Sequence, residues 1–373
     1  MRKKKQEEQE IDFDIIFLLV TLVLLVIGTV MVYSSSFFLS KELYKSGILI
    51  TKKHLIHVVL GMCVMLGVMC TDYRRFSSRP LVYLAMLGSI LALCLCFVPG
   101  IGINGGHARR WIKIAHFSFQ ASELAKIALI LFLAQFLAKK PKLINEFSSV
   151  ILPVLIITGC MVLLIFVEPD FGTAATIGLW SILVLFIAGM RWKHLALVIF
   201  SVAPVGAGLM VLEPYRRNRL LAFINPWDDM QGIGYQIIQS LVAFAKGGIS
   251  GSGLGEGAQK LFFLPAPHTD FILSVVGEEL GFLGVLSVIA LFGIWVWRGF
   301  KIALATNDNF GFFLVVSSVS LIGLQAIINM GVAMSVLPTT GIALPFFSYG
   351  GSTLLTTMFI SGLILSVSRR ARL

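Results

Sequence analysis

The chain contains ten long apolar segments, and these limit what it can fold into. A membrane-spanning helix needs roughly 20 apolar residues, with about 17 to 25 tolerated. Continuous apolar runs also argue against a β-barrel, whose strands alternate apolar and polar residues. Only 13% of the residues are charged, against about 25% in soluble domains. The sequence therefore predicts an all-α polytopic membrane protein with spans near residues 15–33, 54–70, 81–98, 119–138, 148–167, 171–190, 194–212, 271–297, 310–335 and 352–368.

Lys and Arg residues orient these spans. Every second connection is basic, starting with the N-terminal residues 2–5 and ending with the C-terminal residues 369–372. Basic flanks of short connections stay in the cytoplasm, so we expect both termini inside. The meaning of the net charge of +11 depends on which side of the membrane the basic residues lie. We therefore expect no nucleic-acid partner.

The connections predicted to face outward also carry basic clusters, which the orientation rule does not require. Arg109 and Arg110 precede the fourth span, and Arg216, Arg217 and Arg219 follow the seventh. One explanation is that long loops cross the membrane regardless of charge. We favour a second, an anionic ligand such as a phosphate or pyrophosphate lipid, because arginine side chains match phosphate geometry.

The whole chain, residues 1–373, is predicted to be one membrane domain with a large outer loop at residues 213–270. Helical spacing of apolar residues in GYQIIQSLVAFA predicts a short amphipathic or re-entrant helix. The following GGISGSGLGEG lacks the spacing of a nucleotide-binding fingerprint. We interpret it as a flexible hinge whose glycines allow close backbone approach.

Polar residues also lie within the predicted spans. Glu123 and Lys126 share one helix face, and either a structural ion pair or a functional cavity explains them. At least one of Glu278 and Glu279 must face the bundle interior. Asn329 is predicted to hydrogen-bond a neighbouring helix.

Two further outer connections have turn chemistry. Asp170 stands where a short acceptor caps the sixth span. The segment LPTTGIALPFFSYGG, residues 337–351, cannot be a regular helix and is predicted to fold back as a cap buried against protein.

Asp270, at the mouth of the eighth span, is the candidate centre of chemistry. Sugar transfer from a polyprenyl pyrophosphate requires positive charge for the leaving group and a base for the acceptor hydroxyl. Asp270 is either that base or the ligand of a divalent cation, Mg²⁺ or Mn²⁺. Helix capping is the alternative structural role. We expect His268 to orient other groups or to be an ordinary loop residue.

Five motifs follow one another along the chain: EPDFGTA, PYRRNRLLAFINPWDD, GYQIIQSLVAFAKGG, QKLFFLPAPHTDFILSVVGEELG and LPTTGIALPFFSYGGS. In these motifs the sequence resembles the shape, elongation, division and sporulation (SEDS) family, and its cell-division branch in particular. The resemblance implies a peptidoglycan glycosyltransferase that polymerises lipid II outside the cytoplasmic membrane and releases undecaprenyl pyrophosphate. It also implies a multi-pass protein of the bacterial cytoplasmic membrane, placed at the division septum.

The resemblance assigns the essential aspartate of the family to Asp270. The resemblance also implies that the protein has lipid II, a class B penicillin-binding protein and other division proteins as partners. The family often has a glutamate where Ala266 and Pro267 stand, which weakens the case for a metal. The candidate substrate-binding residues are Arg109, Arg110, Lys126, Arg216, Arg219, Gln239, Lys260, His268, Ser348 and Tyr349.

Other functions remain open from the sequence. A lipid II flippase would also need basic residues and a membrane cavity, but it often has an internal repeat, which we do not find. A scaffold for the transpeptidase would need neither Asp270 nor the arginines. The elongation branch of the family is a further alternative.

Overall fold

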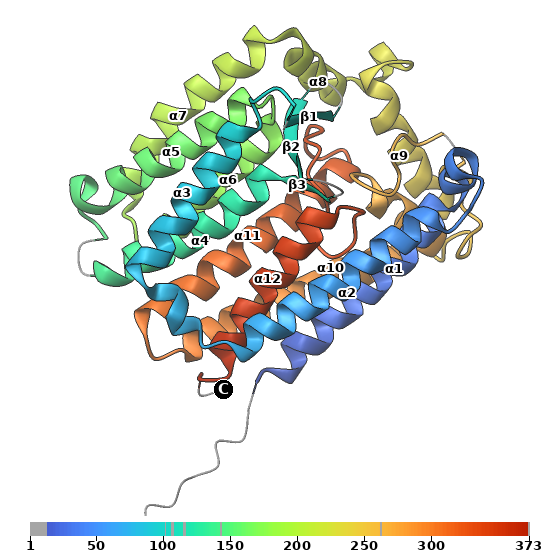
Figure 1. Cartoon of the computed structure of the whole chain (residues 1–373). Coiled ribbons are helices and arrows are strands. Elements are labelled where there is room, and N and C mark those ends of the chain that lie inside the picture. The colour runs from blue at the N-terminus through green and yellow to red at the C-terminus, as the bar shows by residue number, and fades with distance from the viewer. Residues whose placement is uncertain are drawn as a thin grey trace, which may run out of the picture.

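A computed structural model describes residues 13–100, 102–105, 108–114, 117–141, 144–261 and 263–371. Most of this part is helical and forms one bundle (Figure 1). In chain order its helices are α1 (Ile15–Tyr44), α2 (Leu49–Cys70), η1 (Tyr73–Ser77), α3 (Arg79–Leu95), α4 (Ala121–Lys139), η3 (Phe147–Ile151), α5 (Leu152–Val167), α6 (Phe171–Ile187), α7 (Trp192–Leu212), α8 (Pro214–Ile224), η4 (Pro226–Asp229), α9 (Ile233–Gly247), α10 (Ile272–Ala305), α11 (Asn309–Ala333) and α12 (Gly351–Ser368).

Each of the ten predicted spans corresponds to a helix. Eight of the described helices are long and apolar enough to cross a membrane, while α3 and α6 are apolar but have only 17 residues each. Helical structure in all ten segments is therefore confirmed. The count of ten spans stays a prediction.

Three helices form the centre of the bundle. α4, α11 and α12 are mostly buried, whereas α7 is almost entirely exposed along its apolar window. α12 packs along α2, and α4 lies between α3 and α11. The exposed apolar side chains of the outer helices fit a lipid environment, since such a surface is not tolerated in water.

A small β-sheet corrects the all-α prediction. Strands β1 (Gly102–Gly105), β2 (Ala108–Ile114) and β3 (Phe117–Gln120) are antiparallel in the order β1-β2-β3. Ile112 is buried and Lys113 exposed, so the segment has the period of two that is typical of a strand. The sheet lies with α8 and α9 at one end of the bundle, called the sheet end below, and the C-terminus lies at the other (Figure 1).

The predicted outer loop is more ordered than the sequence suggested. The helix predicted in GYQIIQSLVAFA is α9, which is confirmed, and its buried side chains include Ile237, Ser240 and Ala243. α8 was not predicted. It begins with Pro214 at its first position, where a missing N–H costs nothing.

The glycine run packs against a break in α10. Gly281 has φ of 65°, outside the helical region, and the backbone groups freed there bond to the run. The amides of Ser252 and Gly253 donate to the carbonyls of Glu278 and Glu279, at 3.0 Å each. A Cβ on Gly251 would lie 2.2 Å from the Glu279 carbonyl oxygen. Close backbone approach is thus confirmed, and hinge motion stays a prediction.

The segment between α11 and α12 has no helix or strand, as expected. Its residues Phe346 and Phe347 are fully buried against the bundle. α1 approaches so closely that a Cβ on Gly28 would lie 2.4 Å from the Phe346 carbonyl oxygen. Residues 337–350, called the cap segment below, therefore fold back onto protein.

Candidate functional site

The backbone before α10 is held by three consecutive hydrogen bonds. The carbonyl of His268 accepts from the Tyr349 amide at 2.8 Å. The carbonyl of Thr269 accepts from the Ser348 hydroxyl at 2.7 Å. The carbonyl of Asp270 accepts from the side-chain amide of Asn329 at 2.9 Å. Asn329 also donates to the Ile342 carbonyl at 2.7 Å. The cap segment and α11 therefore fix residues 268–270.

This geometry gives three residues a positioning role. The Ser348 hydroxyl and the Tyr349 backbone, which belong to two of the candidate substrate-binding residues, hold the backbone that carries Asp270. Asn329 bonds two loop carbonyls and does not join two helices as predicted. All three fix the position of Asp270 through hydrogen bonds to the backbone of residues 268–270.

Asp270 does not cap α10. The N-cap is Phe271, without a side-chain hydrogen bond. The half-buried Asp270 carboxylate accepts no hydrogen bond from any residue that the structure describes. Gly341 of the cap segment lies close to it, since a Cβ on Gly341 would be 3.7 Å from Asp270 Oδ2. The carboxylate is thus held in place by its backbone alone and is available to a ligand.

Charges of both signs surround this carboxylate. Burial raises the pKa of Asp270, while Arg219 and Arg110 lower it and the negative charge of Asp170 raises it further; the pKa remains above the usual value. A carboxylate with a raised pKa is a better proton acceptor near neutral pH. Two arginines close enough to influence it supply positive charge for an anion.

Arg110 and Arg219 approach from different elements. Arg110, on β2, pairs with Asp170 at 3.5 Å between Nη1 and Oδ1. Arg219, on α8, donates to the Thr339 carbonyl at 3.3 Å, next to Gly341. The two residues therefore converge on Asp270 although more than 100 positions separate them in the sequence.

Asp170 does more than cap a helix. It accepts the Thr173 amide at 3.2 Å, which confirms the predicted cap of α6. It also accepts from the Gln120 side chain at 3.3 Å, besides the ion pair with Arg110. Asp170 thus orients the sheet and Arg110 toward the site.

The other basic candidates have different surroundings. The guanidinium of Arg216 lies over the ring of Phe166 at 4.3 Å from its centroid and donates to the Leu209 carbonyl. Lys126 and Glu123 form a buried ion pair of 2.8 Å, as one of the two predicted explanations requires. The side chain of Arg109 lies outside the described part of the structure.

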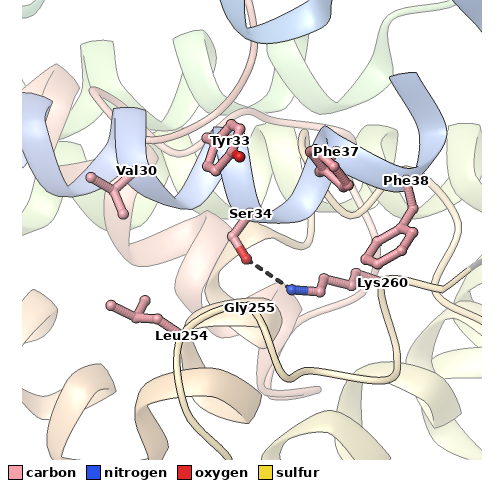
Figure 2. Close-up of a pocket in the computed structure, with 8 residues that line it drawn as sticks. All are labelled: Val30, Tyr33, Ser34, Phe37, Phe38, Leu254, Gly255 and Lys260. Carbon is pink, nitrogen blue, oxygen red and sulfur yellow. Dashed lines mark hydrogen bonds between the residues drawn. The ribbon is translucent and has the colours of Figure 1, made fainter. Parts of the chain in front are cut away.

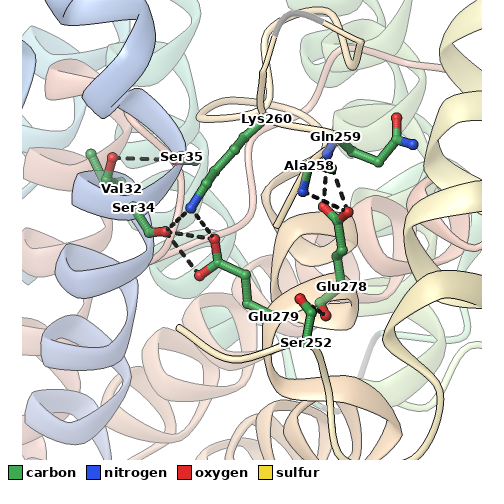
Figure 3. A network of polar contacts seen from close by, with 9 residues as sticks. All are labelled: Val32, Ser34, Ser35, Ser252, Ala258, Gln259, Lys260, Glu278 and Glu279. Carbon is green, nitrogen blue, oxygen red and sulfur yellow. Dashed lines mark hydrogen bonds and ion pairs between the residues drawn. The ribbon is translucent and has the colours of Figure 1, made fainter. Parts of the chain in front are cut away.

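Lys260 belongs to a separate buried network (Figure 3). Its ammonium group bonds Glu279 at 2.6 Å and the Ser34 hydroxyl at 2.9 Å. The neighbouring Glu278 accepts the amides of Ala258 and Gln259. Both glutamates are buried, which confirms the prediction that at least one faces the interior, and they tie the loop to α10.

Lys260 also lines a cavity beside α1 (Figure 2). The cavity has a volume of about 360 Å³ and is otherwise mostly apolar, with Tyr33, Phe37 and Phe38 on its α1 side. Because the charge of Lys260 is paired with Glu279, the structure gives it a packing role. Its hydrogen bonds and its ion pair join it to Ser34 and Glu279, not to Asp270.

Two candidates remain near the site. Gln239 is half-buried on α9 and has no hydrogen bond to the described residues. The His268 ring lies edge-on to Tyr349 with centroids 5.6 Å apart. Burial lowers the pKa of His268, so this imidazole is neutral at pH 7.

Glu168 is a site neighbour that the sequence reasoning missed. It is fully buried, two residues from Asp170. An acid at the end of an apolar span, followed by Pro-Asp, was the available signal.

No group of three or more His, Cys, Asp or Glu residues in the described part of the chain is arranged to hold a metal ion.

Known proteins resemble this chain over nearly its whole length. Residues 14–373 match the model of the FtsW, RodA and SpoVE family, described as cell cycle proteins. A probable peptidoglycan glycosyltransferase FtsW of Geobacter metallireducens is 44% identical over 360 residues, 96% of each chain. Stage V sporulation protein E of Bacillus subtilis is 39% identical over 96% of this chain and 98% of its own.

Solved structures agree with this similarity. A chain from a study of structural coordination of polymerization and crosslinking by a peptidoglycan synthase complex has a TM-score of 0.78 and 30% identity, covering 96% of this chain and 98% of its own. The rod shape determining protein RodA of Thermus thermophilus has a TM-score of 0.70 and 27% identity, covering 97% and 98%.

Proposed function

The chain belongs to the FtsW, RodA and SpoVE family of cell cycle proteins, and we propose that it joins lipid II molecules into glycan strands at Asp270. It is a peptidoglycan glycosyltransferase, as its relatives are named. The observation that carries the proposed site is the convergence of Arg110 and Arg219 on a carboxylate with a raised pKa.

The reaction follows from these charges. Asp270 accepts the proton of the acceptor hydroxyl while that oxygen bonds to the anomeric carbon of the donor sugar. The bond from this carbon to the pyrophosphate oxygen breaks, and its electron pair leaves with undecaprenyl pyrophosphate. Arg110 and Arg219 are placed to stabilise the negative charge that develops there. A base contributes about 10²–10⁴-fold to such a step.

A divalent cation fits this site only together with substrate. Asp170 is already engaged by Arg110, Gln120 and Thr173, which leaves Asp270 as the available carboxylate. Mg²⁺ is commonly bound by one or two carboxylates plus substrate phosphates. A bound cation would supply further charge for the pyrophosphate.

The site faces outward in the proposed topology. We propose ten spans with both termini in the cytoplasm, which puts the sheet end and residues 213–270 on the outer face. The protein would act at the division septum, because relatives named FtsW are 42–44% identical to it over 96% of this chain. The similarity to a chain of a synthase complex supports a partner that crosslinks the glycan, a class B penicillin-binding protein.

The first experiment tests Asp270. The purified protein with its partner is given lipid II and Mg²⁺ or Mn²⁺, and glycan strands are measured. We expect Asp270→Asn to lower the rate about 10²–10⁴-fold, and Glu256→Gln, at an exposed carboxylate of the same loop, to leave it unchanged.

The controls separate the alternatives. Equal polymerisation by Asp270→Asn would exclude this residue as the base. No polymer from a folded wild-type complex would favour lipid II transport or scaffolding. We expect a chelator to slow the wild type and Mg²⁺ or Mn²⁺ to restore the rate; an unaffected rate would exclude the cation.

A further inference from the structure

Four hydrogen-bonding side chains form a second polar cluster next to Asp270. The ring of Tyr349 lies 6.0 Å from that of His54 and 5.6 Å from that of His268, between centroids. His57 lies one turn after His54 on α2. It is so close to α12 that a Cβ on Gly351 would be 2.5 Å from His57 Nε2.

None of these four side chains has a hydrogen-bond partner among the described residues. His54 Nε2, His57 Nδ1 and His268 Nδ1 are fully buried in this unpaired state. His54 itself is 1% exposed. Buried polar groups are nearly always paired, so a group of unpaired ones calls for a ligand or ordered water.

The cluster and Arg219 lie at opposite ends of the cap segment. Arg219 bonds the carbonyl of Thr339, near Gly341. Tyr349 lies at the other end of the cap segment and bonds His268 through its backbone. Asp270 is therefore flanked by a cationic part and by a part made of imidazoles and a phenol.

The chemistry of this second part suits a sugar. Imidazole nitrogens and a phenol hydroxyl can donate or accept hydrogen bonds, as sugar hydroxyl and acetamido groups require. Among the described residues, no Lys or Arg forms a hydrogen bond, ion pair or cation–π contact with these four side chains, which disfavours a pyrophosphate there. Pockets for small polar ligands combine apolar walls with a few such groups.

We propose that His54, His57, His268 and Tyr349 bind the acceptor sugar and direct its hydroxyl to Asp270. This assignment rests on the proposed function, since it takes the arginines as the site of the donor pyrophosphate. It adds α2 to the substrate-binding elements and divides the site into donor and acceptor parts.

The test compares two substrates with the full-length protein and its partner. Lipid II serves as donor and acceptor, whereas lipid II with its acceptor hydroxyl blocked by a further sugar serves only as donor. We expect His54→Leu to lower polymerisation at limiting lipid II at least tenfold, with recovery at high lipid II. Binding of the blocked lipid should change less than twofold in this variant and fall at least tenfold in Arg219→Ala.

Matched variants guard against loss of folding. His194 also has a buried unpaired nitrogen and packs against Phe147 instead, so His194→Leu is the control and should polymerise normally. His54→Gln retains hydrogen-bonding capacity and should recover part of the rate. Tyr349→Phe keeps the ring and the backbone bond, and we expect it to raise the KM for lipid II with kcat retained.

The opposite outcomes are distinct. Wild-type kinetics in His54→Leu and Tyr349→Phe would overturn the proposal and leave the nitrogens to ordered water. Loss of blocked-lipid binding in His54→Leu equal to that in Arg219→Ala would assign the cluster to the donor and overturn it as well. An inactive wild type would instead defeat the proposed function itself.

Discussion

At the scale of single residues, burial has its clearest effect on the pKa of Glu168. It is fully buried, and neither carboxylate oxygen has an N–H or O–H partner among the described residues. Burial, followed by the charge of Asp170, raises its pKa to about 8, against the opposing effects of Cys96 and Arg110. At pH 7 the Glu168 side chain is therefore a neutral acid.

We predict that Glu168→Gln removes a pH dependence of stability. Between pH 4.5, the ordinary pKa, and about pH 8, the folded protein holds a proton that the unfolded chain has lost. Stability therefore falls as pH rises through this window, by about 1.4 kcal/mol per pH unit for one proton. The amide mimics the neutral acid and should flatten this fall. Thermal unfolding in detergent from pH 5 to 9 measures it.

The control for this prediction is an exposed glutamate. Glu146 lies on the surface between α4 and η3, and Glu146→Gln should leave the pH dependence unchanged. If Glu168→Gln kept the wild-type slope, Glu168 would be ionised in the folded protein at neutral pH.

The sequence predicted the location of Asp270 better than the roles of its neighbours. Its place before an apolar span and its family motif are local features. The pairing of Arg110 with Asp170 joins residues 60 positions apart, and no local pattern encodes it. Lys260 and Arg216 were candidate substrate-binding residues, yet they contact Glu279 and the ring of Phe166 within the protein. A basic residue near a span does not reveal its partner.

At the scale of elements, the junction between the glycine run and α10 makes a further prediction. Gly281 has φ of +65°, and its Cβ would lie 2.3 Å from the Gly251 nitrogen. Gly281→Ala should cost about 1–3 kcal/mol from the backbone angle alone, and the clash must displace the run as well. We expect a lower unfolding temperature and reduced polymerisation, because this loop continues to Asp270.

A second glycine of the same helix provides the control. A Cβ on Gly293 would meet nothing within 4 Å, so Gly293→Ala should stabilise α10 slightly through helix propensity. Equal stability and activity in the two variants would mean that the α10 break is not needed for the fold or for the site.

Elements with a strong periodic signal were the ones that the sequence predicted. Apolar runs predicted ten helices, eight of them long, and a period near 3.6 predicted α9. β2 alternates buried Ile112 with exposed Lys113, but only over a few residues beside glycines, so turn chemistry masked it. The glycine run has no period, and its close packing depends on the break at Gly281, which the sequence does not mark.

At the scale of the whole molecule, the geometry of the site indicates whether the two short helices α3 and α6 cross the membrane. The sheet follows α3, and its Arg110 contacts Asp170 at the start of α6. Both residues act on Asp270, at the start of α10. α3, α6 and α10 therefore each have one end at the sheet end. If α3 and α6 stopped within one leaflet, residues 102–120 and residues 213–270 would face opposite sides of the membrane.

We therefore predict that α3 and α6 cross the membrane, for which 17 residues of about 1.5 Å each suffice. Alkaline phosphatase, which is active only outside the cytoplasm, is inserted at the exposed Gly100 or Gly255 or fused after Leu373. Both insertions should be active and the terminal fusion inactive, because ten spans return the chain to the cytoplasm. Activity at Gly255 without activity at Gly100 would mean that α3 does not cross, and Arg110 and Arg219 could not then share one site. An active terminal fusion would show an odd number of spans.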